Sequence, residues 1–160
     1  MKDCSALSAT MRTLSFAAVA AAFAGCADLD RHYIANTEEY EMSEESCEIK
    51  PGSADKVNDM NMMLLRQLSP IGMVEFIEED GEGYWIRKMQ DYGDKIGATC
   101  VLWYSQKDDT VYGQRPFGGV VRHEFRKLTA VYYGRQAKLD AESNKRFLER
   151  LTAAENAPKK

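Results

Sequence analysis

The stretch WIRKMQDYGDKIGATCVLWYS, residues 85–105, decides the fold, because the spacing of its apolar residues changes halfway along. Its first part predicts a helix over residues 82–96 with a single apolar stripe. That stripe consists of Trp85, Met89, Tyr92 and Ile96. Gly97 follows, and glycine is the residue that most often ends a helix. The run 98–105 is then apolar and β-prone without interruption, which is typical of a strand buried on both faces and predicts the central strand of a sheet.

Two further strands are predicted around this unit, at residues 71–77 and 120–133. A strand, a helix and a strand joined by short connections imply a right-handed crossover, so the strands at 71–77 and 98–105 should be parallel. The polar stretch 106–119 is interpreted as an excursion, after which the last strand should return antiparallel beside the central strand. Gly134 should end it. Its two faces should carry Leu128, Ala130 and Tyr132 on one side and Val131 and Tyr133 on the other.

Terminal helices should flank this core. The first is expected from a cap at Asp55 or Asn58 to Leu68, with an apolar face of Met60, Leu64 and Leu68. The last is expected over residues 137–156, with Phe147, Leu148 and Leu151 pointing inward. The predicted fold class is therefore α+β: a small two-layer domain over residues 56–156. Its β-α-β-β core would hold a three-stranded mixed sheet packed on one helix, and residues 157–160 would form a disordered tail.

The N-terminal region predicts an export signal. Leu14 to Ala24 is an apolar run long enough for a signal peptide but too short to span a membrane. We expect translation to start at Met11 rather than Met1, because Met11-Arg12-Thr13 supplies the basic segment that precedes such a run. The run ends in Phe23-Ala24-Gly25-Cys26, which resembles the bacterial lipobox.

The lipobox resemblance implies that residues 1–25 are a signal peptide and that Cys26 becomes an acylated first residue, carrying diacylglycerol and a further chain such as palmitate. An ordinary cleaved signal and a short buried helix are the alternatives. Acyl chains would hold the protein on a membrane, and residues 26–55, acidic and short of aliphatics, would form a lipid-anchored tether. Ala27, rather than an aspartate, follows Cys26, which by the same resemblance favours the periplasmic face of the outer membrane over the inner membrane.

The charge is negative overall and unevenly distributed. The chain carries a net charge of −4, which argues against nucleic acid as a partner. Residues 27–60 hold 10 acidic and 3 basic residues, whereas residues 121–160 hold 10 basic and 5 acidic residues. The two ends could attract each other, the basic end could face anionic lipid or glycan, or both could be solvated surfaces.

Two cysteines, Cys47 and Cys100, would remain after processing and acylation. In an oxidising periplasm they allow one disulfide, which would link the N-terminal stretch to the core. The alternative is two free thiols, with Cys100 buried as a small hydrophobic residue. The spacing of the cysteines and histidines does not predict a metal site, and no cofactor is expected.

No motif predicts catalysis. His32 and His123 cannot be placed together from the sequence, and no serine lies in a G-x-S-x-G elbow. We therefore predict a protein that is not an enzyme. Among the aromatic residues, the core is expected to contain Trp85, Tyr92 and Trp103. The candidates for an exposed surface that contacts a glycan or peptide are Tyr84, Tyr112, Phe117 and Tyr133.

The segment Tyr92-Gly93-Asp94-Lys95-Ile96-Gly97-Ala98, followed by the strand Val101-Leu102-Trp103-Tyr104-Ser105, resembles a group of small uncharacterised bacterial lipoproteins. There a K-x-x-G-A-D-x-V-L pattern joins a helix to the central strand; here Thr99 replaces the aspartate. The layout is more distantly similar to the outer-membrane lipoprotein sensor of the Rcs envelope-stress system, whose two-disulfide pattern is absent.

Together, these features predict a lipid-anchored, non-catalytic binding or scaffold domain in the periplasm. Its partner would be an envelope protein or glycan, contacted through loops and a sheet edge. An envelope-stress sensor and a cell-wall hydrolase are the alternatives.

Overall fold

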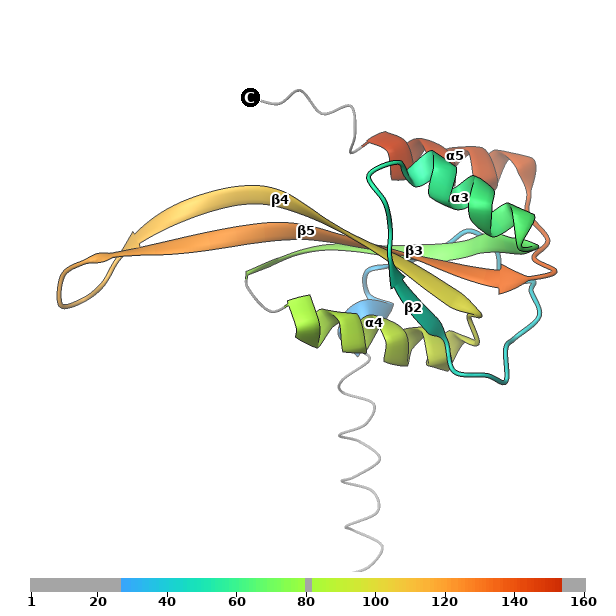
Figure 1. Cartoon of the computed structure of the whole chain (residues 1–160), viewed down its shortest axis with the longest axis horizontal. Coiled ribbons are helices and arrows are strands. Elements are labelled where there is room, and N and C mark those ends of the chain that lie inside the picture. The colour runs from blue at the N-terminus through green and yellow to red at the C-terminus, as the bar shows by residue number, and fades with distance from the viewer. Residues whose placement is uncertain (1–26, 80–81, 154–160) are drawn as a thin grey trace, which may run out of the picture.

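The structure, a computed structural model, describes residues 27–79 and 82–153. The predicted signal peptide with its start at Met11, the cleavage motif Phe23-Ala24-Gly25-Cys26 and the tail 157–160 lie outside these residues. The described elements are α2 (Ala27–Asp30), β1 (Tyr33–Ala35), β2 (Glu48–Pro51), α3 (Lys56–Leu65), β3 (Leu68–Glu79), α4 (Glu82–Ile96), β4 (Cys100–Gln114), β5 (Val120–Arg135) and α5 (Ala141–Ala153). This arrangement confirms the α+β class (Figure 1).

The strands form one mixed sheet in the order β1-β3-β5-β4-β2, with five strands where three were predicted. β2 and β4 are parallel, and the other neighbours are antiparallel. β3 and β4 therefore point the same way, as predicted, but β5 lies between them. The prediction that residues 98–105 form the central strand is wrong. β5 takes that place, and with a neighbour on each side its buried run, residues 128–134, is longer than the buried part of β4.

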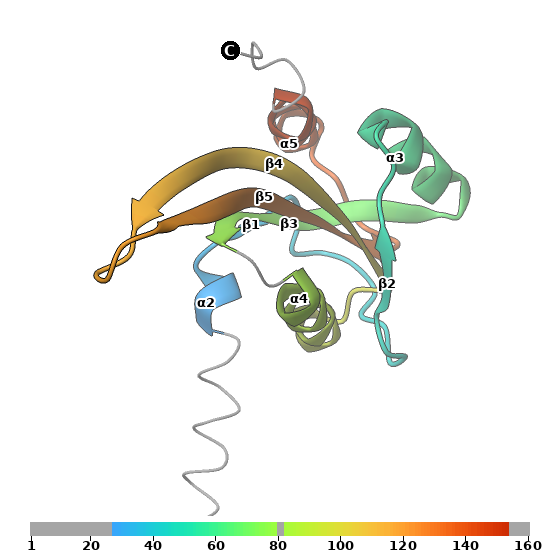
Figure 2. The ribbon, with the colours of Figure 1, turned by 60° about the vertical axis from the view of Figure 1, so that its left-hand side comes forward.

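The sheet is covered on both faces, so the expected two layers are three (Figure 2). On one face Val101, Ala130 and Tyr132 pack against α4. On the other face Val131 and Tyr133 pack against both α3 and α5. The alternation predicted along β5 is confirmed at these positions. The residues that α3 and α5 contribute to this second core are Met63, Phe147 and Leu151, with Leu148 partly buried beside them.

α4 spans the predicted residues, and Gly97 ends it with φ of 66°. α3 differs from its prediction. Asp55 caps it, because its side chain accepts a hydrogen bond from the Asn58 N–H at 2.9 Å. The helix ends at Leu65, and Leu68 already belongs to β3. Its buried apolar residue is Met63, whereas the predicted inward residue Leu64 is exposed.

The acidic N-terminal stretch belongs to the folded domain, which corrects the predicted tether over residues 26–55. β1 pairs with β3, and β2 pairs with β4, so this stretch supplies both edge strands. The segment between them wraps around the C-terminal end of α4: the Tyr40 hydroxyl donates to the Ile96 carbonyl at 2.7 Å, and the Ser43 N–H donates to the Gly97 carbonyl at 2.8 Å. Strands of three and four residues are too short to show a clear alternation in sequence.

The polar stretch 106–119 is not an irregular excursion but most of a hairpin that extends beyond the body of the domain (Figure 1). We call residues 106–126 the arm. β4 and β5 stay paired along it as far as Gln114 and Val120, with a bulge between Lys107 and Thr110. The Arg115 N–H donates to the Gly119 carbonyl at 3.0 Å and closes the turn. β5 also continues through Gly134, which does not end it.

Candidate functional site

The outer edge of β3 is only partly covered. β1 pairs with β3 from Gly72 to Val74, whereas β3 continues to Glu79. Within the described chain, no strand pairs with this side of β3 beyond Val74. Every second residue of such an edge directs its backbone N–H and C=O groups outward, so the edge offers a row of hydrogen-bond donors and acceptors.

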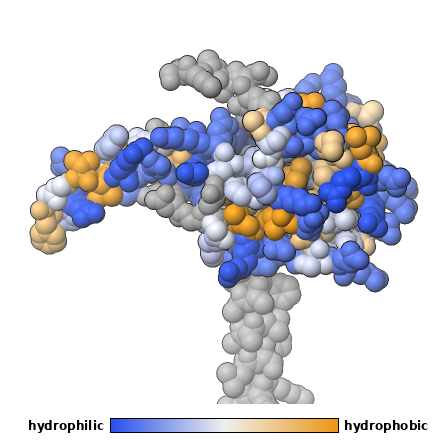
Figure 3. Space-filling model, in the orientation of Figure 1, coloured by the Kyte–Doolittle hydropathy of each residue, from blue (hydrophilic) through white to orange (hydrophobic). Residues whose placement is uncertain are grey.

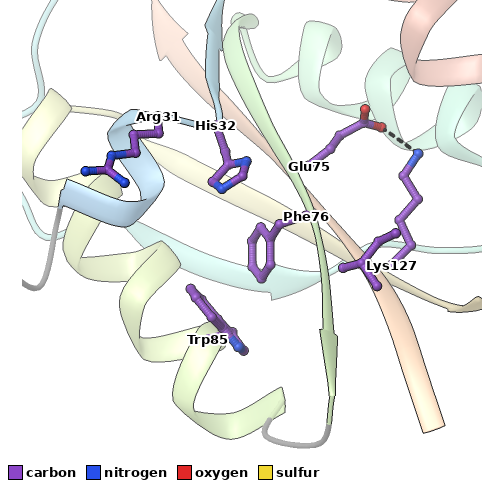
Figure 4. Close-up of a pocket in the computed structure, with 7 residues that line it drawn as sticks. Arg31, His32, Glu75, Phe76, Trp85 and Lys127 are labelled. Carbon is purple, nitrogen blue, oxygen red and sulfur yellow. Dashed lines mark ion pairs between the residues drawn. The ribbon is translucent and has the colours of Figure 1, made fainter.

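A hollow of about 520 Å³ lies along this open edge (Figure 4). Its lining residues are Arg31, His32, Glu75, Phe76, Ile77, Trp85 and Lys127. The rings of Phe76 and Trp85 have centroids 4.4 Å apart, and His32 lies 6.3 Å from Phe76. These three rings form an aromatic row beside the edge, and Ile77 adds an exposed aliphatic side chain. The hollow beside Gly52, Lys56 and Tyr104 is more polar.

Three elements position the aromatic row. Phe76 comes from β3 and Trp85 from the first half of α4, and His32 follows α2. The ion pair between Lys95 Nζ and Asp30 Oδ2, at 2.6 Å, holds α2 on α4. The hydrogen bond from Lys95 lowers the pKa of Asp30. The buried side chain of Leu29 also fixes α2.

The charges of the hollow lie apart from its aromatic row. Glu75 binds Lys127 Nζ at 3.2 Å and Arg150 Nε at 3.4 Å, on the face of the sheet that α5 covers. In Figure 4 Glu75 and Lys127 lie on the opposite side of the strand from Phe76 and His32. Arg31 is exposed at the mouth. The hollow therefore offers apolar contact, backbone hydrogen bonds and one exposed positive charge, which suit binding of an extended ligand.

The predicted disulfide is not formed: Cys47 and Cys100 are both buried free thiols. β2 places Glu48 opposite Cys100. Since neighbouring residues of a strand face opposite sides of the sheet, Cys47 packs in the core against α4, whereas Cys100 packs in the core against α3 and α5. Burial raises the pKa of Cys47 to about 12 and that of Cys100 to about 11.

The other residues singled out from the sequence are dispersed. His32 lines the hollow, whereas His123 lies in the arm opposite Val111. Three of the four predicted surface aromatics, Tyr84, Tyr112 and Phe117, are exposed, but Tyr133 is fully buried. Tyr92 is buried, and Trp85 and Trp103 are partly buried against the same core, as predicted. The described residues contain no group of three His, Cys, Asp or Glu side chains able to hold a metal ion.

Sequence reasoning did not single out Arg31, Phe76 and Ile77. Phe76 and Ile77 appeared only as members of a predicted strand, and Trp85 only as a member of a helix stripe and an expected core residue. Their proximity depends on the turn between β3 and α4 and on where β1 stops. No local pattern carries that information, although the adjacent apolar pair Phe76-Ile77, flanked by Glu75 and Glu78, breaks the alternation of a half-buried strand.

Comparisons of the chain with protein-family models, curated proteins and solved structures find no match. The resemblance to small bacterial lipoproteins stays a prediction from the sequence. One residue separates Lys95 from Gly97, where the pattern of that group has two. Within residues 27–79 and 82–153, no helix has the length and apolar composition needed to span a bilayer.

Proposed function

We propose that this protein is a lipid-anchored, non-catalytic binding domain on the periplasmic face of the bacterial outer membrane. We further propose that it captures an extended peptide segment of another envelope protein along the open edge of β3. The observation that carries this proposal is the coincidence of an unpaired strand edge with an aromatic hollow beside it. The membrane address rests on the lipobox-like Phe23-Ala24-Gly25-Cys26.

Strand addition accounts for both features of the site. Backbone groups of the ligand would pair with those of β3 beyond Val74 and supply affinity that does not depend on sequence. Alternate side chains of an added strand point to the same face, so one row of them would meet Phe76 and Trp85. An apolar residue in that row, with a carboxylate near Arg31, is the ligand chemistry that the hollow favours.

The position of α2 links the site to the proposed anchor. Cys26 directly precedes α2 in the sequence, and Arg31 and His32, which follow α2, line the hollow. A ligand bound there would lie near the attachment point of the lipid. The proposed ligand class is therefore a periplasm-exposed segment of a membrane-associated protein.

Ile77→Lys tests strand capture. Ile77 is 59% exposed on the open edge, so a lysine there should leave the fold intact while placing an unpaired charge against any added strand. Leu65→Lys is the matched control, because Leu65 is 79% exposed on α3. A photoreactive amino acid at Tyr84 in the full chain would report capture in living cells.

The expected result is a protein adduct at position 84 that maps to one extended segment, that disappears with Ile77→Lys and that persists with Leu65→Lys. A synthetic peptide of that segment should then slow hydrogen exchange of the β3 amides. Adducts whose yield Ile77→Lys does not reduce, or that both lysine variants abolish, would contradict strand capture. Cys26→Ser tests the anchor separately: we expect the variant to keep its signal peptide and to incorporate no labelled palmitate.

A further inference from the structure

The arm ends in an exposed apolar cluster that the open edge of β3 does not explain. We call residues 110–123 the arm tip. Its exposed large side chains are Val111, Tyr112, Phe117 and Val120. Phe117, in the turn, is 101% exposed. Figure 3 shows hydrophobic side chains gathered at the end of the arm, away from the body. Exposed apolar groups at the end of a long hairpin are typical of an interaction site.

The register of the hairpin shows which way two side chains of this cluster, Tyr112 and Val120, face. Tyr112 lies opposite Arg122, and Gln114 lies opposite Val120. Residues directly opposite one another share a face. Counting in steps of two along β5, Val120 and Arg122 share the face of Ala130, which packs in the core under α4. Tyr112 and Val120 therefore point to the α4 side of the sheet.

The shape of the arm brings the tip toward the side of the proposed anchor. Figure 2 shows β4 and β5 arching, with the concave side turned toward α2 and α4. α2 is the element that directly follows Cys26 in the sequence. The arm tip and the start of the described chain thus lie on the same side of the sheet (Figure 2).

The charge of the arm tip identifies the kind of surface it fits. Residues 110–123 contain Arg115 and Arg122 but no aspartate or glutamate, in a chain whose net charge is −4. Arg122 pairs with Glu124, whereas Arg115 forms no ion pair with any described residue. Aromatic rings beside arginines, with no carboxylate between Thr110 and His123, are the composition that favours the interface of an anionic bilayer. Arginine can reach headgroup phosphates while its stem stays among apolar groups.

We propose that the arm tip inserts into the interface of an anionic phospholipid bilayer. Phe117 and Tyr112 lie at the boundary of headgroups and acyl chains, and Arg115 binds headgroup phosphates. The inference rests on the proposed membrane location but not on peptide capture at β3. Together with the lipid at Cys26, the arm tip gives the domain two points of attachment, which fix its orientation over the membrane.

The test places a photoreactive phenylalanine analogue at Phe117 in the full chain, reconstituted into vesicles of phosphatidylethanolamine and phosphatidylglycerol. The matched control carries the same analogue at Leu65, an exposed residue on the opposite side of the sheet. Pelleting of the vesicles reports the anchor, and mass spectrometry of the adducts reports the tip. We expect phospholipid adducts at position 117 and none above background at position 65.

Replacing phosphatidylglycerol by phosphatidylcholine should lower the adducts at position 117, and Arg115→Gln should lower them about fivefold, since each basic group near an anionic surface contributes a factor of that order. Ile77→Lys should not change them. Protein that pellets with the vesicles but forms no lipid adduct at position 117 would overturn the inference and leave the anchor standing. Adducts at position 117 to a protein, or to a second copy of the chain, would overturn it as well.

Discussion

Gly93→Ala should destabilise the domain, although alanine normally stabilises the interior of a helix by about 1 kcal/mol relative to glycine. A Cβ atom at position 93 would lie 2.6 Å from Cys47 Sγ and 3.0 Å from Cys47 Cβ. Cys47 cannot retreat easily, because its N–H donates to Asp94 Oδ1 at 2.5 Å and the next residues pair with β4. Overpacking of this kind costs about 1–3 kcal/mol. After subtraction of the helix term, the free energy of unfolding should fall by about 1 kcal/mol.

Urea unfolding followed by circular dichroism measures this change. Gly83→Ala is the control in the same helix, because a Cβ atom there would meet nothing within 4 Å; it should stabilise by a few tenths of a kcal/mol to about 1 kcal/mol. Cys47→Ala removes the nearest atom, so the double variant with Gly93→Ala should lose less stability than the sum of the two single variants. If Gly93→Ala stabilises as much as Gly83→Ala, the described packing of β2 on α4 is wrong.

Two further predictions concern the thiols. Because Cys47 and Cys100 lie on opposite faces of the sheet, the folded protein should migrate identically on a gel with and without reductant. Because both thiols are buried, they should react with a disulfide reagent only after unfolding. A species crosslinked between the two cysteines would contradict the strand register. Burial raises the pKa of Cys47 to about 12, above about 8.5 in an unfolded chain, so the folded state holds the proton longer. The free energy of unfolding should therefore be steady below pH 8 and fall toward pH 12. It should fall less steeply in Cys47→Ala, so equal slopes for the two proteins would refute this reasoning.

Local patterns predicted the parts of the fold that a single face or a single residue specifies. α4 was correct at both ends because one apolar stripe continues until Gly97, whose positive φ ends the helix. The two faces of β5 were correct because Val131 and Tyr133 alternate with Ala130 and Tyr132 through a fully buried run. α5 was correct in its inward residues for the same reason.

Nonlocal pairing was not predictable in this way. β1 and β2 are too short to show a pattern, yet they supply both edges of the sheet. The arm has solvent on both faces, so its strands lack the alternation that marks a half-buried strand. The place of β5 between β3 and β4 depends on partners far apart in the sequence.

The candidate site was not predictable for the same reason, because it too depends on nonlocal pairing. Ile77 is exposed because β1 stops pairing at Val74, and Phe76 meets Trp85 because α4 folds back under β3. Each residue was visible in the sequence, but the hollow between them exists only after the sheet is assembled. The arm tip shows the opposite case, since Tyr112 and Phe117 were already expected at a surface.

The position of β5 also separates the order of synthesis from the order of assembly. β3 and β4 leave the ribosome, and on the proposed route cross the inner membrane, before the strand that must lie between them. Neither can complete its hydrogen bonding until residue 135 has followed. β3 and β4 must therefore each keep one edge unpaired until the last third of the chain is available, although β1 and β2 can already pair with their other edges. This dependence on late partners is the property that slows folding and exposes a chain to aggregation.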